Sequence, residues 1–133
     1  MYNGIYQKEQ YAYAYDTLAK WLALKIQGGS LGGYMAEKGV GRVAIYGVNG
    51  LGRQAYKDIV GSGIEIVCFL DRQAGSFCNG MDGLPVLSPQ QAGQLPEGCY
   101  ILITPEYYFQ EIMADLAEIG IPLGRMVSPS MFL

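Results

Sequence analysis

The segment from Val43 to Gly52 constrains the fold more strongly than any other part of the sequence. Residues 43–46 form a short apolar run that is typical of a buried strand, and it leads directly into the turn Gly47–Gly52. A helical pattern follows over residues 51–60. Because a glycine at position 47 permits a tight turn, and one at 52 lets the helix pack close to the strand, the segment predicts a strand–turn–helix unit.

After this unit, apolar runs and helical patterns continue to alternate along the chain. Ser88-Pro89 and Thr104-Pro105 each combine an N-cap residue with a first-turn proline, which indicates two further helix starts. The predicted strands span residues 43–46, 64–70, 84–87, 99–104 and 126–127, with the third at an edge because it contains a proline. The alternation predicts an α/β fold, a three-layer Rossmann-like parallel sheet of about five strands.

The first part of the chain predicts a helical hairpin, so we assign residues 1–41 to an N-terminal helical extension and residues 42–133 to a Rossmann-like nucleotide-binding domain. Over residues 9–27, apolar side chains recur at the spacing of an amphipathic helix. These side chains are Tyr11, Tyr15, Leu18, Leu22 and Ile26. Ser30 is expected to cap a second, shorter helix. The apolar stripe must be covered, either by one face of the sheet or by a dimer interface.

Composition excludes several classes of protein. Only 16% of the 133 residues are charged, against roughly a quarter in an average globular protein, which favours a homo-oligomer or a larger neighbour that covers apolar surface. A net charge of −3 without a basic run disfavours nucleic-acid binding. No apolar run is long enough to span a bilayer, and the first residues lack the features of a signal peptide. We therefore expect a cytoplasmic protein without membrane insertion.

Residues suited to catalysis or metal binding are scarce. The chain contains no histidine, and its three cysteines form no C-x-x-C pair. Cys68 and Cys99 lie in apolar runs and are expected in the core, whereas Cys78 lies in a glycine-rich loop and is expected to be exposed. No cluster of cysteine and carboxylate residues suggests a metal site. We therefore expect neither a catalytic residue nor a metal in the isolated chain.

The glycine turn is the strongest candidate for a ligand site. A helix that starts at such a turn offers backbone N–H groups and a positive dipole end to a phosphate, which would be held by Gly47, Asn49, Gly50 and Gly52. Asp71 follows 19 residues after Gly52, at the end of the next predicted strand, where its carboxylate would accept a hydrogen bond from a ribose hydroxyl and favour NAD over NADP.

Two features leave alternatives open at this site. Asn49 stands where the middle glycine of G-x-G-x-x-G would be, and its side chain could obstruct a pyrophosphate, so the turn is either a phosphate cradle or purely structural. Thr104 is expected to end the strand beside the first one, where it would either contact the ligand or only cap the following helix.

A series of short segments in this order resembles the Rossmann-like domains attached to bacterial polysaccharide and glycan biosynthesis proteins. Examples are the N-terminal domain of sugar O-acyltransferases and the nucleotide-binding domain that precedes nucleotide-sugar dehydratases. The segments are Ile45-Tyr46-Gly47, Gly52-Arg53, Phe69-Leu70-Asp71, Gly83-Leu84-Pro85-Val86 and Ile101-Leu102-Ile103-Thr104. The resemblance covers about residues 42–127 and implies NAD, NADP or a nucleotide sugar as ligand, and a glycan-assembly protein as partner.

Three functions remain open at this stage. The first is a non-catalytic nucleotide-binding module. The second is an enzyme, either a fragment of an NAD-dependent oxidoreductase or a methyltransferase that uses S-adenosylmethionine, although no acid–base group is visible. The third is a structural or oligomerisation domain that has lost its ligand.

Overall fold

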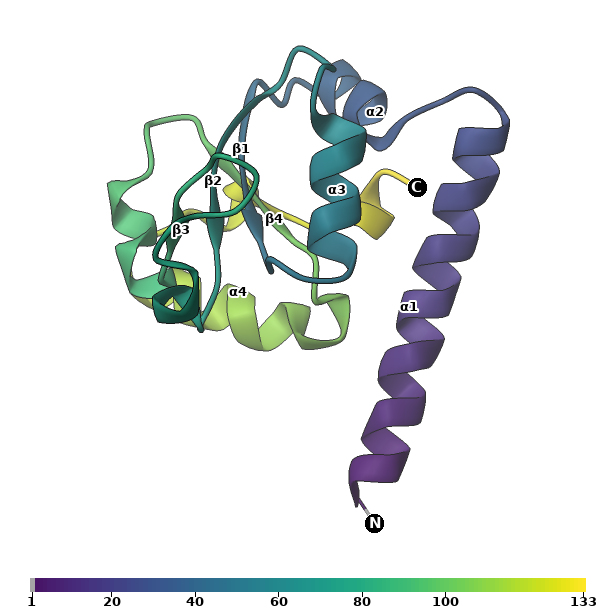
Figure 1. The fold of residues 1–133 in the computed structure, drawn as a ribbon, viewed down its shortest axis with the longest axis horizontal. Helices are drawn as coiled ribbons and strands as arrows, with labels where there is room; N and C mark the ends of the chain where they lie inside the picture. The colour runs from purple at the N-terminus through teal and green to yellow at the C-terminus, as the bar shows by residue number, and fades with distance from the viewer. Residues whose placement is uncertain (1) are drawn as a thin grey trace.

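A computed structural model describes the backbone of residues 2–133 and the side chains of residues 8–133. At its centre is a sheet of five parallel strands in the order β3-β2-β1-β4-β5 (Figure 1). The strands are β1 (Arg42–Tyr46), β2 (Glu65–Leu70), β3 (Val86–Leu87), β4 (Tyr100–Ile103) and β5 (Met126–Val127). The predicted α/β fold is confirmed, including the position of β3 at an edge.

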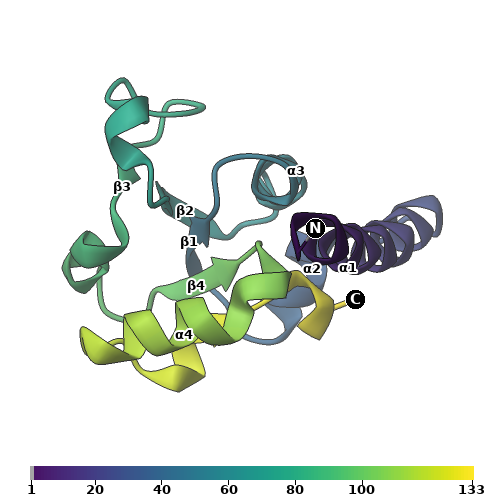
Figure 2. The same cartoon turned by 90° about the horizontal axis from the view of Figure 1, so that it is seen from below.

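Helices cover both faces of the sheet, which makes three layers (Figure 2). The helices α1 (Tyr2–Ile26), α2 (Leu31–Glu37) and α3 (Leu51–Ile59) lie on one face, and α4 (Phe109–Glu118) lies on the other. Short 3-10 helices span Ala74–Phe77, Pro89–Gln94, Glu106–Tyr108, Leu123–Arg125 and Pro129–Met131. The predicted cap of α2 is confirmed, because the Ser30 hydroxyl oxygen accepts a hydrogen bond from the Gly33 N–H at 2.9 Å.

Side-chain alternation along the strands divides the core into two clusters. Val43 and Ile45 of β1 join residues of α1, α2 and α3 in one cluster. Ala44 and Tyr46 point the other way and join residues of α4. Because Trp21 of α1 belongs to the first cluster, the N-terminal helices share a hydrophobic core with the sheet.

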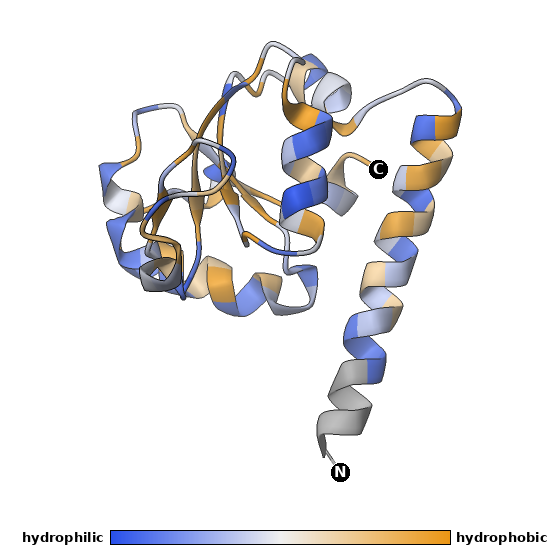
Figure 3. Ribbon diagram, in the orientation of Figure 1, coloured by the Kyte–Doolittle hydropathy of each residue, from blue (hydrophilic) through white to orange (hydrophobic). Residues whose placement is uncertain are grey.

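Helix α1 contacts the rest of the chain through a face that the sequence pattern did not indicate. Thr17, Trp21 and Leu24 are buried, whereas every residue of the predicted apolar stripe is at least 44% exposed. Apolar residues nevertheless recur along this helix (Figure 3). The interpretation that the stripe packs on the sheet is therefore wrong. Polar contacts of Thr17 and Trp21 fix the orientation of the helix, and the spacing of apolar residues does not reveal them.

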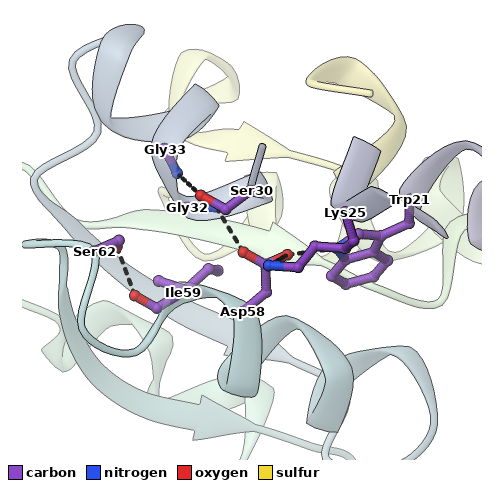
Figure 4. Close-up of polar contacts among 8 residues, drawn as sticks. All are labelled: Trp21, Lys25, Ser30, Gly32, Gly33, Asp58, Ile59 and Ser62. Atoms are coloured by element: carbon purple, nitrogen blue, oxygen red, sulfur yellow. Dashed lines mark hydrogen bonds and ion pairs between the residues drawn. The ribbon is translucent and has the colours of Figure 1, made fainter. Parts of the chain in front are cut away.

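Asp58 joins the three helices on this face of the sheet (Figure 4). Its side chain is 4% exposed. One carboxylate oxygen accepts a hydrogen bond from Trp21 Nε1 at 2.7 Å, and the other accepts one from the Gly32 N–H at 3.1 Å. Lys25 Nζ lies 3.7 Å from the first oxygen and supplies the compensating charge. A buried carboxylate requires such partners, so we assign Asp58 a structural role at the junction of α1, α2 and α3.

The cysteines lie where the sequence indicated. Cys68 and Cys99 are buried and Cys78 is exposed, and all three are free thiols. Burial raises the pKa of Cys68 to about 12 and that of Cys99 to about 11, which keeps both thiols protonated and unreactive at neutral pH. In the part of the chain that the structure describes, no helix has the length and apolar character needed to cross a membrane.

Candidate functional site

The loops that follow β1, β2 and β4 meet at the carboxyl edge of the sheet. The chain passes from β1 through α3 to β2 and then β3, and afterwards crosses back to place β4 on the other side of β1. The strand order therefore reverses between β1 and β4. In open α/β sheets this reversal leaves a crevice outside the carboxyl ends of the strands, where ligands bind.

The glycine turn has the close geometry that the sequence predicts. Gly47 has a φ of 101°, a left-handed conformation that favours glycine. A Cβ on Gly52 would lie only 1.7 Å from the Gly47 carbonyl oxygen. Position 52 therefore admits no side chain, and its glycine allows the first turn of α3 to touch the end of β1. The structural roles predicted for both residues are confirmed.

Asp71 follows β2 and holds the turn from the other side. One oxygen of its carboxylate accepts a hydrogen bond from the Val48 N–H at 3.1 Å, and the other accepts one from the Gln73 N–H at 2.8 Å. The carboxylate is half-buried. Asp71 thus links the glycine turn to the loop after β2. Since each carboxylate oxygen has two lone pairs, acceptor capacity remains for a ligand hydroxyl.

Asn49 and Gly50 form the outer part of the turn, and both are exposed. A Cβ added to Gly50 would have no atom within 4 Å, so the space above this residue is open. Asn49 is not among the residues that line the cavity beside Gly47. The asparagine side chain therefore leaves this cavity accessible.

Thr104 lies beneath the crevice. It is 2% exposed, and its hydroxyl donates a hydrogen bond to the Tyr46 carbonyl oxygen at 2.6 Å. The predicted capping role is wrong: Pro105 precedes the 3-10 helix Glu106–Tyr108, no side chain caps it, and α4 begins only at Phe109. A Cβ on Gly47 would lie 2.6 Å from the Thr104 hydroxyl oxygen, so the loops after β1 and β4 are in close contact. The hydroxyl hydrogen is used in the hydrogen bond that links the end of β4 to β1.

A cavity of about 190 Å³ opens between the loops after β1, β2 and β4. A second cavity of about 500 Å³, between Tyr46, Arg72 and α4, shares the first two of these residues with it. We call the two together the carboxyl-edge crevice. Residues that line the smaller cavity include Tyr46, Gly47, Asp71, Arg72, Pro105 and Tyr108.

Arg72 lies between the two cavities. Its guanidinium hydrogen-bonds the Tyr46 hydroxyl, and it lies 3.3 Å from a carboxylate oxygen of Asp115 on α4. Burial raises the pKa of Tyr46, an effect that the Arg72 charge partly offsets, so the phenol stays protonated at neutral pH. The hydrogen bond to Tyr46 in turn raises the pKa of Arg72. The crevice thus contains a permanent positive charge beside a carboxylate and a neutral phenol.

The sequence interpretation did not single out Tyr46, Arg72 or Tyr108 as site residues. A signal for the first two was present: Tyr46 is the last residue of β1, and Arg72 is the second residue after β2. Residues at the carboxyl ends of neighbouring parallel strands converge on the crevice. Tyr108 follows β4 by five positions within a 3-10 helix, which no simple pattern indicated. Among the described residues, no group of three or more cysteine and carboxylate side chains is arranged to hold a metal ion.

Sequence comparison relates the chain to one protein family. A search of curated proteins finds no significant match. A family model described as C2185-like, N-terminal, matches residues 39–127, well over half of the chain. The match includes the sheet and the crevice and leaves out α1. The chain therefore belongs to the C2185-like N-terminal domain family.

Proposed function

We propose that this domain is a non-catalytic nucleotide-binding module whose ligand is NAD, NADP or a nucleotide sugar. The observation that carries the proposal is the glycine turn together with Asp71, which borders a cavity at the point where the strand order reverses. This is the position where a nucleotide binds in Rossmann-like sheets.

Different groups at the carboxyl edge of the sheet suit different parts of such a ligand. A phosphate is suited to the amino end of α3, next to the open space above Gly50, where helix N–H groups and the helix dipole favour negative charge. A ribose hydroxyl is suited to the Asp71 carboxylate. The smaller cavity matches a ribose phosphate in scale, and the base or sugar extends into the larger cavity or into solvent.

Arg72 is the cation that lines both cavities of the crevice, where it can pair with a ligand phosphate. The side chains of Arg72 and Asp115 are both more than 60% exposed, and exposed ion pairs contribute only about 0–1 kcal/mol. The guanidinium can therefore leave Asp115 at little cost in free energy and bind a ligand phosphate, with which arginine forms paired hydrogen bonds. This movement would also join the two cavities of the crevice.

A nucleotide sugar within this class is supported by the resemblance to Rossmann-like domains of bacterial glycan biosynthesis. The module would then serve a glycan-assembly protein as a sensor, scaffold or subunit. Cytoplasmic location follows from the same proposal, because nucleotide sugars and NAD are available to such proteins there.

A structural domain without a ligand is the second candidate. It is favoured by one observation, that both oxygens of Asp71 already accept backbone hydrogen bonds. In that case Asp71 only fixes the turn, and Asn49 replaces the glycine that a phosphate site would need.

Thermal unfolding with a panel of ligands separates the two candidates. The panel contains NAD, NADH, NADP, UDP-sugars and S-adenosylmethionine, each at saturating concentration. A ligand present at 100 times its dissociation constant stabilises the folded state by about 2.7 kcal/mol, which raises the melting temperature by several degrees in a domain of this size. We expect such a rise with NAD, NADP or a nucleotide sugar. No rise with any nucleotide would contradict the proposal and favour the structural domain.

Three variants locate the site, each compared with its own ligand-free melting temperature. Asp71→Ala and Arg72→Ala are expected to abolish or strongly reduce the ligand-induced rise. Asp16→Ala is the control, because Asp16 is an exposed residue of α1 that forms an ion pair with Lys20 on the same helix. An unchanged ligand-induced rise in Asp71→Ala would show that the carboxylate does not contact the ligand.

A further inference from the structure

Helix α1 carries a continuous apolar stripe that the rest of the described chain leaves largely exposed. Its members lie at successive spacings of four, three, four and four residues, so they share one face of the helix. They are Tyr11 at 69% exposure, Tyr15 at 76%, Leu18 at 44%, Leu22 at 61% and Ile26 at 77%. We refer to these five residues as the α1 stripe.

The α1 stripe cannot turn inward to be buried within the same chain. Thr17 donates a hydrogen bond to a Glu106 carboxylate oxygen at 2.5 Å. Trp21 donates one to Asp58, as Figure 4 shows. Both anchors lie on the neighbouring face of the helix and are nine-tenths or more buried. Rotating the stripe toward the sheet would break both contacts, so the described residues supply no surface that covers it.

The surroundings of the stripe suit another helix. In an α-helix each residue advances by about 100° around the axis, which places Ala12, Ala19 and Ala23 on one flank of the stripe, with Asp16 and Lys20 beyond them, and Lys25 on the other flank. Small flanking side chains permit close approach of a second helix, and the four-three-four spacing is that of a knobs-into-holes seam. Helices that lie on membranes usually have a polar face rich in lysine and arginine. Charged residues of both signs occupy that face here, which favours a protein partner.

The exposed area of the α1 stripe is close to the area that each partner buries in a dimer interface. A tyrosine side chain buries on the order of 150–250 Å² when covered, and leucine and isoleucine less, so the five partly exposed side chains together offer at most roughly 650 Å². A standard interface buries about 800 Å² on each partner. Two copies of the stripe, with the alanines between them, therefore approach the area of a stable interface.

The order of residues in the stripe indicates how the copies would be oriented. The two tyrosines lie toward the amino end and Leu22 and Ile26 toward the carboxyl end. In an antiparallel pair each tyrosine meets an aliphatic side chain of the other copy, and Leu18 meets its own copy near the two-fold axis. Lys8, which is exposed on the same side, then lies near the carboxyl end of the opposite helix, where a positive charge is favoured. A parallel pair would instead place Lys8 beside Lys8.

We propose that two copies of this chain form a two-fold symmetric dimer by antiparallel packing of their α1 stripes. None of the five stripe residues lines the crevice, so the dimer does not depend on whether a nucleotide binds. A self-complementary patch is what a closed two-fold interface requires.

Sedimentation velocity over about 1–100 µM chain tests the dimer. We expect twice the monomer mass for the wild type and a monomer for Leu22→Glu, with a dissociation constant raised at least tenfold. Leu123→Glu is the matched control, since Leu123 is 60% exposed but lies outside α1, and this variant is expected to stay dimeric. A wild-type chain that is monomeric at every concentration, whether or not it binds vesicles or another protein, would overturn the proposal. So would a Leu22→Glu variant that associates like the wild type.

Cysteine cross-linking tests the orientation in a Cys78→Ser background, because Cys78 is the exposed thiol of the chain. We expect Leu18→Cys to form a disulfide-linked dimer on mild oxidation. Tyr11→Cys is expected to form no such dimer. Cross-linking of Tyr11→Cys as efficient as that of Leu18→Cys would overturn the antiparallel arrangement.

Discussion

Two aspartates of this domain accept hydrogen bonds at similar distances but differ in how deeply they are buried. Asp58 is 4% exposed at its side chain and is enclosed by α1, α2 and α3. Asp71 holds the glycine turn with the same carboxylate chemistry, yet it lines a cavity and is only half-buried. Asp58 also borders a cavity, but its near-complete burial and its hydrogen bonds to α1 and α2 favour a structural role. An open side allows Asp71 to hold the turn and a ligand together.

The largest expected effect comes from the turn that Asp71 holds. Gly52→Val places a branched side chain on a Cβ position 1.7 Å from the Gly47 carbonyl oxygen. Since backbone surrounds this position, we expect destabilisation of more than about 4 kcal/mol, or failure to fold. Urea denaturation followed by circular dichroism measures it, with Gly124→Ala as a control whose Cβ meets no atom within 4 Å. A urea midpoint equal to that of the wild type would refute the close contact between α3 and β1.

Removing the enclosed carboxylate is the next largest change. Asp58→Ala leaves Trp21 Nε1 and the Gly32 N–H without their acceptors, and we expect a loss of about 3–5 kcal/mol in the free energy of unfolding. Asp16→Ala, which removes an exposed ion pair with Lys20, is expected to change stability by less than about 0.5 kcal/mol. Equal effects of the two substitutions in denaturant titrations would show that the burial of Asp58 does not increase its contribution to the free energy of unfolding.

Removing the half-buried carboxylate should have a smaller effect on stability. Asp71→Ala releases two backbone N–H groups that solvent can reach in part, so we expect a loss of about 1–2 kcal/mol. Asp71→Asn keeps one acceptor oxygen and should lose less. If Asp71→Ala destabilised the domain as much as Asp58→Ala in the same denaturant titration, the distinction between the two aspartates would fail.

The smallest effect concerns the partner of Arg72. Asp115→Asn breaks an exposed ion pair, so we expect a change below about 0.5 kcal/mol in stability. Because the substitution frees the guanidinium, affinity for a phosphate-bearing nucleotide should stay equal or rise a few-fold. Titration calorimetry of the two proteins measures this, and a tenfold weaker affinity in Asp115→Asn would contradict the role proposed for Arg72.

The fold was predictable because it depends on local patterns that repeat along the chain. Apolar runs punctuated by glycine and proline marked all five strands, and the steric demands on Gly47 and Gly52 follow from any close strand–turn–helix unit. The edge position of β3 followed from Pro85, which cannot donate to a central ladder.

The parts that were not predictable depend on contacts between distant residues. The orientation of α1 is decided by Thr17 and Trp21, whose acceptors lie 89 and 37 residues away along the chain. Thr104 has the local pattern of a helix cap, but the Tyr46 carbonyl oxygen, 58 residues away, receives its hydroxyl hydrogen. Asp115, the ion-pair partner of Arg72, lies 43 residues away along the chain, so no local pattern indicates this contact.

Nuclear magnetic resonance titration of the isotope-labelled chain with a nucleotide sugar or NAD tests the central claim most directly. Amide signals report the position of binding as well as its occurrence. The account predicts that the largest shifts fall on the turn Gly47–Gly52 and on Asp71 and Arg72, and that Asp58 and its neighbours stay unchanged. Saturating nucleotide that moves no amide of the carboxyl-edge crevice would contradict it.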